Sequence, residues 1–169
     1  MQTINIAGAG GIGRAAALIA LNTPNWDVKV LLGDISEDAL SSAKAYCHDH
    51  EHLETYVMSG DDTAMAPYFE SSDVVLDCLP GSLAPRIAGL AKAHGAHYAN
   101  LTEYVKETDE IMALAKDADT GFILQTGLAP GYINILGLRL FNMFCEKYGV
   151  DEVEDLEMKV GALTKTAVE

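Results

Sequence analysis

Ile4-Asn5-Ile6-Ala7-Gly8-Ala9-Gly10-Gly11-Ile12-Gly13 is the stretch of sequence that decides the fold of this chain. A short apolar strand runs directly into a G-x-G-x-x-G loop, and the residues that follow have helical spacing. Gly8 permits a tight turn, Gly10 lets the backbone approach a pyrophosphate, and Gly13 lets helix and strand pack closely. The stretch predicts a dinucleotide-binding β-α-β unit, in which the cofactor-binding residues of the loop are Gly8, Gly10, Gly11, Ile12 and Gly13.

An acidic residue follows this loop at the distance that such a unit requires. Asp34 closes the second apolar run, about twenty residues on, where a carboxylate can accept hydrogen bonds from the adenosine ribose. The same carboxylate repels a 2'-phosphate, and the adjacent Ile35-Ser36 contains no arginine to compensate. We therefore expect NAD in preference to NADP, with Asp34 and Ile35 at the adenosine. The alternative is a purely structural turn, with Asp34 as a helix cap.

Short apolar runs alternate with helical stretches along the rest of the chain, which is typical of an α/β Rossmann fold with a doubly wound parallel sheet. The apolar runs predict strands at Thr3–Ala7, Val28–Leu32, Glu54–Met58, Val74–Cys78, His97–Ala99 and Gly121–Gln125. Helical spacing predicts helices at Gly11–Asn22, Glu37–Cys47, Leu83–His94 and Glu103–Asp117.

The pattern changes beyond Gly127. A Gly-Pro-Gly loop leads into a predicted helix at Tyr132–Tyr148, and an acidic connector leads into a strand-like Leu156–Leu163. That strand has no visible partner, so we expect a further part of the domain or a second chain to cover it. The sequence predicts a Rossmann domain over residues 1–130, followed over residues 131–169 by a linking helix and the first strand of a truncated second domain.

Composition excludes several classes of partner. The formal net charge is -14 for 169 residues, which disfavours nucleic acid and anionic membranes, because both require a positive field. The amino terminus has no basic region before its first apolar run, and no run is long enough to span a membrane, so we expect a cytoplasmic protein. Three cysteines without a C-x-x-C pair, and histidines without ligand spacing, predict neither disulfides nor a metal site.

In an open parallel sheet, ligands bind at the carboxyl ends of the strands. The loop after the fourth strand is small and rigid, and we expect Leu79, Pro80 and Gly81 to contact the cofactor. The loop after the fifth strand contains Glu103 and Tyr104, which are candidate catalytic residues near the nicotinamide. An ordinary turn at the first loop, and a helix cap made by Thr102 at the second, are the alternatives.

Four linked motifs resemble the saccharopine dehydrogenase-like oxidoreductases, a family that includes lysine 6-dehydrogenase and carboxynorspermidine-forming enzymes. The resemblance covers about the first 140 residues, and it rests on Gly8-Ala9-Gly10-Gly11-Ile12-Gly13, Asp73-Val74-Val75-Leu76-Asp77-Cys78-Leu79-Pro80, Asn100-Leu101-Thr102-Glu103-Tyr104 and Gly127-Leu128-Ala129-Pro130-Gly131 with Asn134.

The resemblance implies an NAD(P)-dependent oxidoreductase that acts on the CH–NH bond of an amino acid or amine. It also implies a second α/β domain that supplies much of the substrate pocket and often a homodimer interface. On this basis we expect substrate-binding groups beyond Glu169 and no activity from these residues alone. Two alternatives stay open: a non-catalytic NAD-binding or oligomerising module, and an amino-acid dehydrogenase of the diaminopimelate type.

Overall fold

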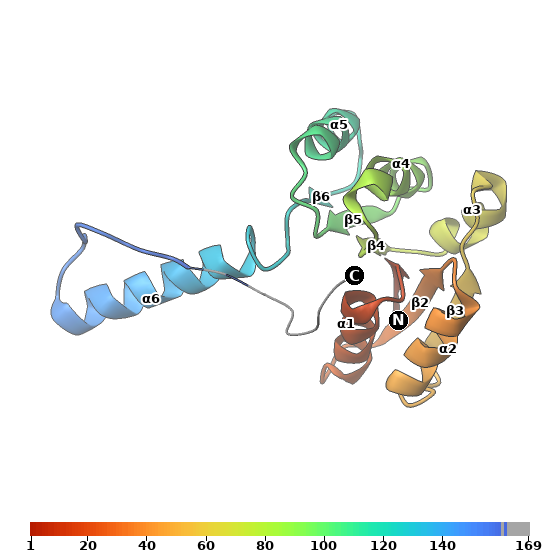
Figure 1. Cartoon of the computed structure of the whole chain (residues 1–169), viewed down its shortest axis with the longest axis horizontal. Coiled ribbons are helices and arrows are strands. Elements are labelled where there is room, and N and C mark those ends of the chain that lie inside the picture. Colours follow the sequence, from red (N-terminus) through yellow and green to blue (C-terminus); the bar gives the residue numbers. More distant parts are fainter. Residues whose placement is uncertain (160, 162–169) are drawn as a thin grey trace, which may run out of the picture. The chain divides into compact units, whose positions relative to one another are not determined.

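The computed structural model describes residues 1–159 and 161, and its larger unit, Met1–Leu124, is built on a six-stranded parallel sheet (Figure 1). The strand order is β3-β2-β1-β4-β5-β6. Chain order therefore reverses between β1 and β4, which confirms the predicted doubly wound Rossmann architecture. The strands are β1 (Gln2–Ala7), β2 (Val28–Asp34), β3 (Leu53–Val57), β4 (Val74–Asp77), β5 (His97–Asn100) and β6 (Phe122–Ile123).

Helices cover both sides of this sheet (Figure 1). Figure 1 shows α1 and α2 on one side of the strands and α3, α4 and α5 on the other. Their bounds are α1 (Gly11–Asn22), α2 (Glu37–Tyr46), α3 (Asp62–Glu70), α4 (Ala84–Ala93) and α5 (Val105–Ala115), with a short 3-10 turn, η1 (Gly81–Leu83), before α4.

The two layers of helices enclose two apolar cores. Small residues of α1, such as Ala17 and Ala20, pack with Val30 and Leu32 of β2 in the first core. In the second, Ile87 of α4 packs with side chains of the opposite face of the sheet and of the neighbouring helices. Because both faces of β2 are buried, its sequence is a continuous apolar run rather than an alternating one, as parallel strands require.

One helix was not predicted from the sequence. α3 follows β3 and is only nine residues long, with Pro67 inside it. Asp61 begins it by accepting a hydrogen bond from the Thr63 amide at 2.9 Å. Burial of Met65 and Phe69 stabilises the helix. These side chains are buried by residues far away in the chain, which the local spacing of so short a segment does not reveal.

Other predicted elements differ from the structure at their ends. The predicted helix at Glu103–Asp117 begins at Val105 instead, and the predicted strand at Gly121–Gln125 is reduced to Phe122–Ile123. The alternative of a helix cap made by Thr102 is wrong, because Tyr104 is the residue that precedes the helix and no side chain caps it.

A second unit begins at Gln125 and contains α6 (Tyr132–Tyr148). The loop before this helix has a fixed shape, because the amide of Tyr132 donates to the Gly127 carbonyl at 2.9 Å and the amide of Gly131 donates to Oδ1 of Asn134 at 3.1 Å. Residues 156–159 form no strand, and the rest of the predicted strand, apart from Gly161, lies outside the described residues. In the part of the chain that is described, no helix is long and apolar enough to cross a membrane.

Candidate functional site

The glycine loop between β1 and α1 is shaped by close backbone contacts. Gly8 has a φ of 105°, which L side chains rarely adopt, and a Cβ there would lie 3.1 Å from the carbonyl oxygen of Cys78. A Cβ at Gly13 would overlap the carbonyl oxygen of Gly8. At Gly10 and Gly11, in contrast, an added Cβ would meet no atom within 4 Å. Two glycines therefore close the turn, and two leave an open approach to the backbone at the start of α1.

Asp34 joins the end of β2 to this loop. Its carboxylate accepts a hydrogen bond from the Ala9 amide at 2.7 Å and another from the Ser36 amide at 2.9 Å. A carboxylate has about four acceptor positions, so two backbone bonds leave capacity for ribose hydroxyls. Asp34 thus positions the loop and also presents acceptor oxygens beside it.

The first of two cavities, which we call the β2-side cavity, lies next to Asp34 and has a volume of about 270 Å³. That size suits a flat ring rather than a whole dinucleotide, since complete ligand pockets occupy roughly 300 to 1,000 Å³. Its lining is mostly apolar: Asp34, Ile35, Met58, Ser59, Leu79, Pro80, Leu83, Arg86 and Ile87.

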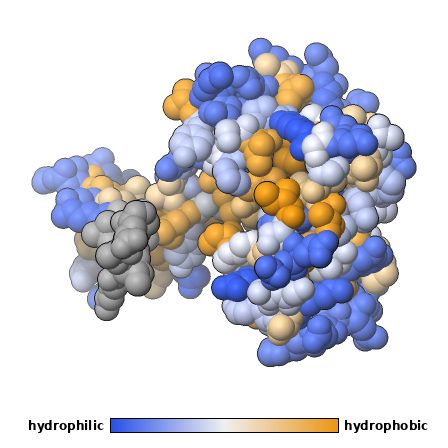
Figure 2. Space-filling view, turned by 45° about the vertical axis from the view of Figure 1, so that its right-hand side comes forward, coloured by the Kyte–Doolittle hydropathy of each residue, from blue (hydrophilic) through white to orange (hydrophobic). Residues whose placement is uncertain are grey.

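The surface beside this cavity contains apolar side chains that a globular chain normally buries. Ile35 is 80% exposed, and Leu83 is 43% exposed. Figure 2 shows apolar side chains gathered in the middle of one face of the larger body, with hydrophilic surface above and below them. Exposed apolar residues around a small cavity are typical of a ligand-binding surface.

Sequence reasoning missed Arg86, which lines the β2-side cavity. The sequence has no arginine next to Asp34, but α4 brings Arg86 to the same cavity from 52 positions further along the chain. No local motif marks this residue. Only the crossing of α4 over the sheet places it there.

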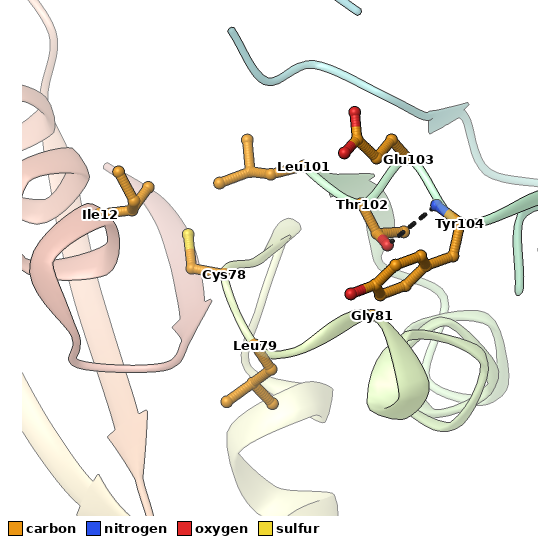
Figure 3. Close-up of a pocket in the computed structure, with 8 residues that line it drawn as sticks. All are labelled: Ile12, Cys78, Leu79, Gly81, Leu101, Thr102, Glu103 and Tyr104. Atoms are coloured by element: carbon orange, nitrogen blue, oxygen red, sulfur yellow. Dashed lines mark hydrogen bonds between the residues drawn. The ribbon is translucent and has the colours of Figure 1, made fainter. Parts of the chain in front are cut away.

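A second cavity, which we call the β5-side cavity, has a volume of about 300 Å³ (Figure 3). It is lined by Ile12, Cys78, Leu79, Gly81, Leu101, Thr102, Glu103 and Tyr104. Ile12, Cys78 and Leu101 form its apolar side, and the polar groups all come from the loop after β5 (Figure 3). The structure therefore brings the two catalytic candidates, Glu103 and Tyr104, into one cavity with Ile12 of the glycine loop.

Gly81 has a packing role within this cavity. A Cβ on Gly81 would overlap the ring of Tyr104 and the hydroxyl of Thr102. The Tyr104 ring lies over Gly81, as Figure 3 shows, while Tyr104 is 58% exposed. The space next to Gly81 is therefore filled by Tyr104, so Gly81 shapes the cavity through that ring.

Asp77 fixes the loop that lies between the two cavities. It is 2% exposed, and it accepts hydrogen bonds at 2.9 Å from the Leu79 amide and from the Tyr98 hydroxyl. Burial raises the pKa of Asp77 to about 6, although both hydrogen bonds oppose that shift. Burial and the nearby Asp77 carboxylate raise the pKa of the Cys78 thiol to about 12, so Cys78 is a neutral lining residue rather than a nucleophile.

These features fit a dinucleotide. Leu79 lines both cavities, and the open backbone at Gly10 and Gly11 begins a helix whose N–H groups attract phosphate. The two cavities can take the two ring systems, and the glycine loop can take the pyrophosphate. Over the described residues, no group of His, Cys, Asp or Glu side chains is arranged to hold a metal ion.

Comparisons with known proteins agree with this geometry. The family model described as the saccharopine dehydrogenase NADP binding domain matches residues 4–124. The apo saccharopine dehydrogenase (L-Glu forming) from Saccharomyces cerevisiae superposes with a TM-score of 0.70 at 15% identity, and the match covers 88% of this chain and 32% of that one. A comparison with curated proteins gives no significant match.

Other dehydrogenases share the fold at similarly low identity. An apo scyllo-inositol dehydrogenase from Lactobacillus casei has a TM-score of 0.66 at 13% identity, covering 89% of this chain and 43% of that chain. Shikimate dehydrogenase from Mycobacterium tuberculosis has a TM-score of 0.55 at 14% identity, covering 88% and 52%. The chain thus spans between about a third and a half of the length of these solved structures.

Proposed function

Because the chain belongs to the saccharopine dehydrogenase NADP-binding domain family, we propose that it is the NAD-binding part of an oxidoreductase acting on the CH–NH bond of an amino acid or amine. The observation that carries the proposal is the pair of cavities on either side of Leu79, next to the open backbone at Gly10 and Gly11.

In this proposal each part of the site binds one part of the cofactor. The β2-side cavity takes the adenine, and Asp34 accepts hydrogen bonds from the adjoining ribose. The amides at the start of α1 bind the pyrophosphate. Ile12 and Leu79 contact the part of the cofactor that extends from the pyrophosphate into the β5-side cavity. The nicotinamide ring then lies beside Glu103 and Tyr104.

We propose NAD as the preferred cofactor on the charge of Asp34. The 2'-phosphate of NADP would lie next to the Asp34 carboxylate, which already accepts hydrogen bonds from the Ala9 and Ser36 amides. The phosphate and the carboxylate are both anions and would repel each other. The description of the family names NADP binding. Our proposal of NAD for this member therefore rests on its own residues at the end of β2.

Calorimetric titration with NAD and NADP tests this preference. Asp34→Asn is the informative variant, because it removes the charge and keeps an acceptor oxygen for one of the two backbone amides, those of Ala9 and Ser36. We expect NAD to bind the wild type at least roughly tenfold more tightly than NADP, and the difference to shrink severalfold in Asp34→Asn. An unchanged ratio in the variant would show that Asp34 does not set the preference. Asp34→Ala serves as the control that also removes the acceptor.

The polar groups of the β5-side cavity support the proposed reaction class. A bound nicotinamide supplies or accepts the hydride. The chain itself must orient the substrate and move the proton of the amine nitrogen, and Glu103 and Tyr104 present a carboxylate and a phenol for that purpose. Both side chains are exposed, so an amine can reach them.

Replacing Glu103 and Tyr104 separately tests their roles. The assay is turnover of an amine substrate by a protein that contains this chain and is active. We expect Glu103→Gln to lower turnover about a hundredfold and to remove one limb of the pH profile, because a general acid-base contributes roughly that factor. Tyr104→Phe keeps the ring over Gly81 and removes only the hydroxyl, so it separates packing from proton transfer. Unchanged turnover in Glu103→Gln would remove that residue from the mechanism.

A further inference from the structure

Arg86 occupies an unusual place in the β2-side cavity. Six apolar side chains line this cavity, and Arg86 is its basic residue. Its Nε donates to Oδ1 of Asp62 at 3.0 Å, and its Nη2 donates to the same oxygen at 2.6 Å and to the Ser59 carbonyl at 3.0 Å. These contacts join the start of α4 to the start of α3.

These bonds engage the Nε and Nη2 side of the guanidinium, so a ligand can meet the group at its Nη1 edge or at its flat faces. Guanidinium N–H groups point outward in the plane of the group, and one edge of that plane is committed to Asp62 and Ser59. The flat faces carry no N–H groups, and they are only weakly hydrated, so they stack readily on aromatic rings. A guanidinium held in this way can add a flat surface to the lining of a cavity that is mostly apolar and whose other polar residues are Asp34 and Ser59.

The role of Asp62 in this arrangement is to hold the plane still. Asp62 is the first residue of α3, which Asp61 caps through the Thr63 amide. Its carboxylate therefore comes from a helix end with a defined position. As a surface ion pair it contributes little stability, since such pairs are worth at most about 1 kcal/mol. Its greater effect is on the orientation of Arg86.

We propose that Arg86 is the adenine-contacting residue of the β2-side cavity, stacking the face of its guanidinium on the purine ring, and that Asp62 positions it. This inference rests on the proposed dinucleotide binding. It assigns adenine recognition to α4 and α3, rather than to the residues after β2 alone. Because the contact is with the ring face, it is the same for NAD and for NADP.

Titration calorimetry with NAD, NADP and ADP-ribose measures the contribution of Arg86. We expect Arg86→Ala to lower the affinity for all three ligands by about tenfold, which corresponds to a stacking contribution of roughly 1.4 kcal/mol. Arg86→Lys keeps the charge but has no flat face, so we expect it to recover little of the loss. Arg86→Met, which keeps an apolar stem, provides a further variant if Arg86→Ala does not fold.

Asp62 is tested by its dependence on Arg86. We expect Asp62→Asn alone to lower the affinity for NAD about threefold. The same substitution should have no effect on that affinity when Arg86 is already replaced by alanine, because a positioning residue acts only through the residue that it positions. Lys29→Ala is the matched control, because it breaks the 2.7 Å surface pair with Glu54 and neither residue lines the cavities. Its affinity for NAD should equal that of the wild type.

Three results would overturn the proposal, and they differ from a failure of the proposed function. Full recovery in Arg86→Lys would mean that a point charge is enough. A loss confined to NADP would mean that Arg86 binds the 2'-phosphate. Unchanged affinity in Arg86→Ala, with normal NAD binding by the wild type, would remove Arg86 from the site while leaving the proposed function intact. No binding by the wild type would instead contradict the proposed function itself, and the assignment of Arg86 with it.

Discussion

At the scale of single residues, Gly13 and Gly10 have different constraints although they belong to one motif. Gly13→Ala would drive a Cβ into the Gly8 carbonyl, so we expect it to cost about 3 kcal/mol or more of unfolding free energy. Gly10→Ala has open space and a φ of -66°, so its stability should stay within about 0.5 kcal/mol of the wild type.

Urea unfolding and NAD titration of the two variants separate these roles. Gly10→Ala should fold normally and lose roughly tenfold or more in NAD affinity, because its methyl group occupies the approach to the pyrophosphate. Equal affinity in Gly10→Ala and the wild type would contradict the assignment of this backbone to phosphate binding.

Asp77 should make stability depend on pH. Its pKa is raised in the folded state to about 6 from 3.8, so the folded protein binds the proton more tightly than the unfolded chain does. The resulting stabilisation is complete below the unfolded pKa and is lost as pH rises through about 6. Between about pH 5 and pH 8 we expect a loss of roughly 1 kcal/mol from this group.

Asp77→Asn provides the comparison, since its amide can still accept from Leu79 and donate to the Tyr98 oxygen. Subtracting the unfolding free energies of wild type and variant at each pH cancels the other titrating groups. The difference should move by roughly 1 kcal/mol in favour of the variant as pH rises. A difference that stays constant over this range would show that burial does not shift the pKa of Asp77.

Residues that act through local backbone geometry were predictable from the sequence. The turn at Gly8 and the close packing at Gly13 follow from a spacing within one β-α unit, and the structure shows both contacts. Arg86 was not predictable, because α4 places it 52 positions from Asp34. The buried position of Asp77 also depends on Tyr98 of the next strand, which local sequence does not specify.

At the scale of elements, the cap of α2 offers a direct test of local structure. Ser36 precedes the helix, and its Oγ accepts from the Ala39 amide at 3.2 Å. We expect Ser36→Ala to lower the unfolding free energy by about 1 kcal/mol, as loss of an N-cap does. Ser42→Ala, on the exposed side of the same helix, is the control and should change stability by less than about 0.5 kcal/mol. Equal effects of the two substitutions in urea unfolding would contradict the cap.

Elements with strong periodicity were predicted well, and those held by distant contacts were not. α1 begins and ends at the predicted residues, since its glycine start and apolar spacing are both local signals. α3 was missed because Met65 and Phe69 are buried by residues far away in the chain. The strand predicted at Leu156–Leu163 has no strand structure in residues 156–159, where alternating apolar residues lack a neighbouring strand to pair with.

At the scale of the whole molecule, the larger unit contains all the parts of the proposed site. Both apolar cores, the six strands and every residue that lines the two cavities lie within Met1–Leu124. We therefore expect a chain ending at residue 130, the predicted domain boundary, to unfold cooperatively and to bind NAD within about twofold of the full chain. Loss of cooperative unfolding on truncation would place part of the folding unit beyond that boundary.

The net charge of -14 makes anion binding a local property of this molecule. The helix N-terminus acts over a few ångströms, within the Debye length of about 8 Å at physiological salt, so it can bind phosphate on an acidic protein. The sequence did not predict the two separate cavities, because the residues that line them follow five different strands, β1 to β5.

Backbone amide chemical shifts measured by NMR during addition of NAD test whether the glycine loop and the two cavities bind the dinucleotide, because these shifts report binding and its location together. We expect the amides of Gly10, Gly11 and Ile12 to shift together with those of cavity residues such as Ile35, Leu79, Glu103 and Tyr104. If NAD leaves the glycine loop unshifted, or shifts only residues outside the two cavities, the assignment of this site to the dinucleotide is wrong.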